Sequence, residues 1–317
     1  MSLHYFVYIY IMSIKVNHTK AGFFSCCTVR LSLIINYTNN KLKLPNEIDC
    51  SNTFNRYKVN KTNDITYDFF EKYENIITNN FNFNDKIIFN SMTQFTNYTH
   101  IDFNNISPFV KKYFTPSNQV RVIIEDIEQK YNLKYDNICV LYYRGTDKKQ
   151  ETTKCNYDDY LIYVNEILKK HIDIQFLLQS DEQNFIEFMI KKLPNNTFHF
   201  NDEIKDTEKN SISFAQKFLS IIQIMSKCKF IICGSGNCDL WTILYRGNMN
   251  NVFQSLNYGW YTDQVNSDIS LENFNIEDNN NPVIGINLHK LRSKFKKNKK
   301  IKKLQKMKKN RKKGKGS

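Results

Sequence analysis

The chain lacks the residue patterns that bind structural zinc or cross a membrane. Its eight cysteines include no C-x-x-C pair and no cysteine–histidine pair at zinc spacing. The apolar N-terminal segment 3–14 is shorter than the roughly 20 residues that span a bilayer. It also lacks the basic start and the small-residue cleavage site of a signal peptide. We therefore expect a cytoplasmic protein without a transmembrane helix.

Two common nucleotide-binding signatures are also missing. Neither the P-loop pattern G-x-x-x-x-G-K-[ST] nor the dinucleotide pattern G-x-G-x-x-G occurs. Glycine and proline are scarce, with 9 and 5 residues, whereas Asn, Lys and Ile are abundant. This bias is typical of an AT-rich genome and carries no functional information.

Acidic residues are absent from the C-terminal end of the chain. Residues 290–317 hold 16 Lys and Arg and no Asp or Glu, so the net charge of +14 leaves the first 289 residues at −2. A block of like charges repels itself and cannot bury a core, which predicts a disordered basic tail over 289–317. Such a tail can contact an anionic surface, although a solubilising or targeting tail is the simpler interpretation.

The first 289 residues have the composition of a globular protein. The chain is 41% hydrophobic and contains 24 Phe and 19 Tyr. Residues 1–115 are irregular in pattern, apart from a helix expected near 67–73 and a short strand near 86–89. We therefore treat 1–115 as a separate N-terminal lobe without a derivable topology.

Strands and helices alternate from residue 116 onward. Apolar runs predict strands, and apolar residues at helical spacing predict helices between them. The expected strands are 138–143, 173–178, 197–200 and 229–233, and the expected helices are 120–131, 157–170, 185–193, 214–226 and 238–245. Such β-α units predict an α/β domain with a parallel sheet over about 116–288.

Three of these strands end in polar or glycine-containing loops. The loops are Arg144–Lys148, Ser180–Asp181 and Gly234–Asn237. Because the carboxyl ends of neighbouring parallel strands lie on one edge of a sheet, we expect these loops to converge, and ligands bind at that edge in open α/β sheets. The sequence thus favours a nucleotide-type site.

The residue types in these loops suit a phosphorylated ligand. Arg144 offers a planar fork of donors for phosphate or carboxylate. Gly234–Asn237 joins a strand to a helix, so its backbone and the helix N-terminus can approach an anion, and Ser235 and Asn237 can cap the helix or bond a phosphate. The simpler alternatives are a solvated turn at Arg144 and a capping motif at Gly234–Asn237.

Asp181, Lys148 and Glu151 each allow a functional and a purely structural interpretation. Asp181 can bind a sugar or base hydroxyl, or cap the following helix. Lys148 can neutralise charge on a leaving phosphate, and Glu151 can take a proton from an attacking hydroxyl. Taken singly, Lys148 and Glu151 also fit an exposed surface loop. No D-x-D occurs in the expected site, so we expect no metal dependence.

The order of these motifs resembles the α1,6-fucosyltransferases, a group that includes core N-glycan and nodulation-factor enzymes and is related to the protein O-fucosyltransferases. Residues 143–148 followed by Glu151 and 157–160 resemble the arginine motif of that family, and 176–181 and 219–237 resemble later parts. The similarity spans about 118–250. The chain departs from the family in its single arginine at position 144 and in Gly234–Asn237, where the family has a serine pair.

The resemblance implies a GT-B fold with two Rossmann-like lobes, the N-terminal one on the acceptor side. It implies fucosyl transfer with inversion from GDP-fucose to a glycan or glycoprotein hydroxyl, without a metal or a cofactor. Arg144 would contact the donor diphosphate, and Lys148 and Glu151 would take part in catalysis. The expected donor-binding residues are Arg144, Gly145, Thr146, Asp147, Asp181, Gly234, Ser235, Gly236 and Asn237.

Two rival functions remain open. A non-catalytic nucleotide-sugar or glycan-binding module would keep Arg144 and the glycine loop but would not need Glu151. A nucleic-acid-binding protein would act through the 289–317 tail, with aromatic residues stacking on bases. The aromatics lie instead in periodic, core-like segments, so the transferase reading requires no nucleic acid.

Overall fold

The computed structural model describes residues 13–18, 21–77, 81–145, 155–193, 195–200, 210–257 and 259–263. The C-terminal half of this region contains a six-stranded sheet in the order β5-β4-β3-β6-β7-β8. All neighbours are parallel except β7 and β8. The predicted α/β domain with a parallel sheet is therefore confirmed. The strands are β3 (Ile138–Tyr143), β4 (Gln175–Ser180), β5 (Thr197–His199), β6 (Phe230–Cys233), β7 (Val252–Leu256) and β8 (Gly259–Tyr261).

Helices cover both faces of this sheet, which explains why β3 and β6 are apolar throughout. Alternate residues of β3 point to opposite faces: Val140 belongs to one apolar cluster and Leu141 to the other. The second cluster contains the buried faces of α5 (Tyr157–Lys170) and α6 (Gln183–Lys192). The first contains those of α4 (Asn118–Tyr131), α7 (Ile212–Lys227) and α8 (Asn237–Arg246).

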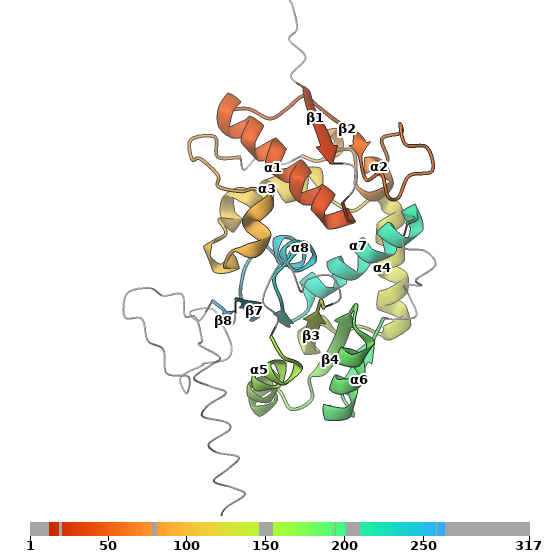
Figure 1. Ribbon diagram of the computed structural model, residues 1–317, viewed down its shortest axis with the longest axis vertical. Coiled ribbons are helices and arrows are strands. Elements are labelled where there is room, and N and C mark those ends of the chain that lie inside the picture. Colours follow the sequence, from red (N-terminus) through yellow and green to blue (C-terminus); the bar gives the residue numbers. More distant parts are fainter. Residues whose placement is uncertain are drawn as a thin grey trace, which may run out of the picture.

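The N-terminal half has a small parallel sheet of its own. β1 (Ser13–His18) pairs with β2 (Glu47–Thr53), and α1 (Phe23–Lys41) connects them. The remaining helices are α2 (Thr66–Phe69) and α3 (Phe103–Tyr113), and short 3-10 turns include η2 (Ser91–Phe95) and η3 (Tyr98–His100). Figure 1 shows this half lying over α7 and α8, on the side of the six-stranded sheet opposite α5 and α6.

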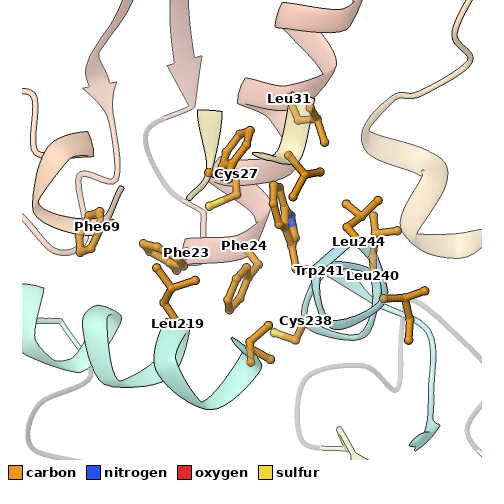
Figure 2. Close-up of a cluster of buried hydrophobic side chains, with 14 of the residues drawn as sticks. Phe23, Phe24, Cys27, Leu31, Phe69, Leu219, Cys238, Leu240, Trp241 and Leu244 are labelled. Atoms are coloured by element: carbon orange, nitrogen blue, oxygen red, sulfur yellow. The ribbon is translucent and has the colours of Figure 1, made fainter. Parts of the chain in front are cut away.

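A single apolar core joins the two halves. Phe24 of α1 contacts the rings of Phe218 in α7 and Trp241 in α8, with centroids 5.2 and 6.2 Å apart. Figure 2 shows Phe24 and Trp241 between α1, α7 and α8. Phe114, which follows α3, lies 4.6 Å from the Trp241 ring. Because one cluster includes residues of β1, α1, α7 and α8, neither half buries its apolar surface alone.

Several sequence expectations for the N-terminal half were wrong. Segment 86–89 forms no strand; Ile87 and Phe89 are buried, but the Ile87 backbone bonds the Asn39 side chain instead of a neighbouring strand. The helix expected over 67–73 ends at Phe69, because Phe70 is extended and pairs with Pro116. The 19-residue helix α1 was not expected at all.

In the C-terminal half the bounds of β3 and α5 are as predicted, and those of the other expected elements differ by at most two residues at either end. β4 extends to Ser180, so Gln179 and Ser180 belong to the strand and not to the loop. The helix expected over 120–131 begins at Asn118, because Ser117 Oγ caps α4 by accepting the Val120 N–H at 3.5 Å. The basic tail lies outside the described residues. Within the described ranges, no helix combines the length and apolar character needed to cross a bilayer.

The shared core predicts cooperative unfolding. Phe24→Ala should lower the free energy of unfolding by about 3–5 kcal/mol, because it removes a buried ring between the halves. Ile88→Ala is the matched control, since that side chain is 84% exposed and its loss should cost less than about 0.5 kcal/mol. Urea unfolding followed by tryptophan fluorescence and by far-UV circular dichroism should give coincident transitions; two separated transitions would contradict one shared core.

Candidate functional site

The carboxyl edge of the six-stranded sheet gathers the predicted loops. Strand β3 lies between β4 and β6, parallel to both. Arg144 follows β3, Asp181 follows β4 and Gly234 follows β6. Tyr143 and Ser180 are direct register partners, which places Arg144 beside Asp181. The predicted convergence of the three loops is confirmed.

The Arg144 guanidinium is oriented by the helix that follows β6. Arg144 is half-buried, and its Nη1 donates to the Cys238 thiol with a 2.9 Å nitrogen–sulfur distance. Cys238 lies in the first turn of α8, and burial raises the pKa of its thiol. A protonated thiol accepts this hydrogen bond without bringing a negative charge to the arginine. Arg144 is thus held at a helix N-terminus, where anions are favoured.

Acidic side chains enclose Gly145. Its backbone N–H donates to Asp181 Oδ1 at 2.7 Å. The Glu182 carboxylate accepts the Tyr157 hydroxyl at 2.6 Å, and it would lie 2.1 Å from a Cβ atom placed on residue 145. No side chain fits there unless Glu182 moves. Asp181 and Glu182 thereby fix the backbone that carries Arg144.

The Gly234–Asn237 loop is bound to the rest of the protein at every residue. Gly234 N–H donates to Asp239 Oδ1 at 3.1 Å, and the Ser235 hydroxyl donates to the Ser255 carbonyl at 2.8 Å. Asn237 Oδ1 accepts the Thr28 hydroxyl of α1 at 2.7 Å. Two of the backbone N–H groups expected to meet a phosphate, those of Gly234 and Gly236, therefore have protein partners. Donor binding by this loop stays a prediction.

Tyr98 supports the candidate site, although the sequence did not predict this role. It comes from η3 in the N-terminal half and is fully buried. Its hydroxyl accepts the Gly236 N–H at 3.1 Å and lies 3.1 Å from the Gly236 carbonyl oxygen. Gln254 of β7, also fully buried, accepts the Tyr98 N–H at 2.8 Å and donates to Ser235 Oγ at 2.8 Å. These partners lie far apart in sequence, so no local pattern signals them.

Four predicted site residues lie outside the described residues: Thr146, Asp147, Lys148 and Glu151. Their roles stay predictions. Among the residues that the structure describes, no group of three or more His, Cys, Asp or Glu side chains is placed to hold a metal ion.

Comparisons with known proteins give a match in structure only. No family model matches the sequence, and no curated protein matches it. NodZ alpha-1,6-fucosyltransferase soaked with GDP-fucose is similar with a TM-score of 0.47 and 10% identity, covering 74% of this chain and 92% of that one. Fucosyltransferase NodZ from Bradyrhizobium gives a TM-score of 0.46 at 10% identity, with the same two coverages. At these values the likeness alone establishes neither a family nor an activity.

The enclosure of Gly145 leads to a testable coupling. Gly145→Ala should destabilise the fold by roughly 0.5–1.5 kcal/mol, because the new methyl group displaces the flexible end of Glu182 from its hydrogen bond with Tyr157. Glu182→Ala in the same chain should recover most of that loss. A double-mutant cycle measured by urea unfolding tests this, and additive effects of the two substitutions would contradict the contact.

Proposed function

We propose that the protein is a glycosyltransferase that transfers fucose from GDP-fucose to a hydroxyl group of a glycan or glycoprotein, with inversion and without a metal. The observation that supports it best is the position of Arg144. Its guanidinium lies at the carboxyl edge of a parallel sheet, beside Asp181 and bonded to the first turn of α8. This combination suits the diphosphate of a nucleotide sugar.

In this proposal Arg144 binds the diphosphate and neutralises the charge that grows as the glycosidic bond breaks. The N-terminus of α8 contributes its dipole to the same oxygens. Asp181 binds a hydroxyl of the nucleotide sugar, and Lys148 and Glu151 act on the leaving group and the acceptor, as the family resemblance implies. The arrangement is GT-B-like, with the N-terminal half, including β1, α1 and β2, on the acceptor side.

A non-catalytic binding module is the second candidate. The extensive bonding of Gly234–Asn237 to Thr28, Asp239 and Ser255 gives a rigid loop, which suits binding as well as catalysis. Binding of GDP without turnover of any GDP-sugar would support this candidate. A role in nucleic-acid binding would rest on the 289–317 tail alone, and deletion of the tail would then abolish function.

The proposal predicts nucleotide-dependent stabilisation. GDP and GDP-fucose should raise the melting temperature in EDTA, because a ligand that binds only the folded state stabilises it by mass action. Arg144→Ala should raise the Kd for GDP about tenfold to a hundredfold, the cost of a lost charge-assisted hydrogen bond. Differential scanning fluorimetry and calorimetric titration measure the two effects, with GDP-mannose and UDP-sugars testing donor choice.

Arg121→Ala is the matched control. Arg121 belongs to α4, outside the three loops that follow β3, β4 and β6, and forms an ion pair with Glu71 at 2.6 Å. This variant should bind GDP as the unchanged protein does. Absence of any shift with all nucleotides, in protein shown to be folded, would overturn the donor assignment.

A further inference from the structure

A histidine–serine pair lies at the carboxyl end of β1. His18 is the last residue of that strand, and Ser25 belongs to the first turn of α1. His18 Nε2 lies 3.0 Å from Ser25 Oγ, and both side chains are half-buried. The small sheet does not need this pair for its stability. Its core is formed by apolar neighbours such as Val16 and Phe24.

The second ring nitrogen of His18 is available. Within the described residues, Nδ1 has no hydrogen-bond partner, and the His18 side chain is half-buried. When Ser25 Oγ accepts the Nε2 proton, Nδ1 keeps its lone pair and is a proton acceptor. The Ser25 hydroxyl can accept from Nε2 or donate to it, and in the first of these arrangements Nδ1 is the base.

A continuous path of contacts links this pair to Arg144. Ser25 and the buried Thr28 are three residues apart on α1, so they are neighbours along one side of the helix, separated by a rise of about 4.5 Å. Thr28 bonds Asn237 at 2.7 Å, and the next residue, Cys238, bonds Arg144 at 2.9 Å. Figure 1 shows the arrowhead of β1 pointing toward α7 and α8. The pair therefore lies beside the helix whose Thr28 contacts the first turn of α8.

We propose that His18 takes the proton from the acceptor hydroxyl in place of Glu151, the base that the family resemblance implies, and that Ser25 positions the His18 ring. This inference rests on the proposed function and deepens it, because it places the base on the N-terminal half. Asn17 is exposed at the end of β1, and the Asn52 amide at the end of β2 donates to it at 2.9 Å. These two amides suit hydroxyl-rich acceptors. The ligand class is a sugar or protein hydroxyl.

The step balances with the groups named. The acceptor oxygen forms a bond to the anomeric carbon of the donor while its proton passes to His18 Nδ1. The bond between that carbon and the diphosphate oxygen breaks, and its electron pair stays on the oxygen held by Arg144. The products are the glycoside, GDP and a protonated His18, which then releases its proton to water.

The surroundings keep His18 neutral near pH 7. Burial lowers the pKa of His18 from its ordinary value. The neighbouring Cys26 thiol of α1 donates to the His18 carbonyl at 3.7 Å, and the charges of Arg56 and Lys58, which follow β2, act on Cys26. Burial raises the pKa of Cys26 to about 11, so this thiol stays neutral below pH 8. A neutral imidazole is the form that accepts a proton.

Release of GDP from GDP-fucose, with water as acceptor, tests the proposal in the full chain. Wild-type kcat/KM should fall as the pH decreases through the pKa of His18, below about 6.5. His18→Gln should lower the rate at pH 7.5 by about a hundredfold or more, and its kcat/KM should no longer fall as the pH decreases. Ser25→Ala should lower the rate less, and Ser25→Thr, which restores a hydroxyl, should recover activity.

His100→Gln is the matched control, because His100 is exposed in η3. It should keep the wild-type rate and pH profile. Stabilisation by GDP should persist in His18→Gln, since Arg144 is intact, and this shows that the variant folds. Glu151→Gln, measured in parallel, tests the other candidate base.

Three results would overturn the inference. The first is a wild-type rate in His18→Gln, or a rate that still falls at low pH in that variant. The second is a fall at low pH that disappears in Glu151→Gln alone. Covalent labelling of Ser25 by a fluorophosphonate in the native protein would instead identify a hydrolytic nucleophile. If the wild type neither binds GDP nor releases it, the proposed function itself fails, and the role of His18 fails with it.

Discussion

The arrangement depends on the burial of α8 between the six-stranded sheet and α1. Trp241 of α8 is fully buried, its ring lies against Phe24 and Phe114, and its indole N–H donates to Thr28 at 2.9 Å. A buried aromatic residue contributes several kcal/mol only where its surroundings are closely packed. That packing fixes where α8 begins, and the first turn of α8 carries the thiol that orients Arg144. The packing of the apolar core therefore also positions the candidate site.

The polar contacts around Gly236 show how the halves cooperate. Tyr98 satisfies the Gly236 N–H from η3, and Gln254 binds both Tyr98 and Ser235 from β7. Buried polar groups that lack partners cost about 1–3 kcal/mol each, so such a network tolerates few alternative positions of the loop. The glycine loop gains rigidity from residues of the N-terminal half, at the cost of N–H groups that an anion would otherwise use.

The sequence was informative where order along the chain determines position in space. Alternating β-α units require a parallel sheet, and the end of each strand then lies on one edge; Arg144, Asp181 and Gly234 could be placed together from this alone. Phe23–Lys41 was missed because its apolar residues face two sides, the small sheet and α8, and give no single stripe. Tyr98 and Thr28 act on residues more than 130 positions away, and local patterns do not report such contacts.

In the proposed mechanism, the two halves divide the chemistry according to what each can supply. The C-terminal edge offers a fixed cation and a helix N-terminus, which favour an anionic leaving group, whereas it offers no histidine among the residues described around Arg144. The N-terminal edge offers a neutral imidazole, kept uncharged by burial, and amides suited to hydroxyl groups. A base close to Arg144 would be weakened by the positive charge, because a nearby cation lowers the pKa of an imidazole. Separation of the two functions on opposing edges, joined by α1 and α8, avoids that conflict.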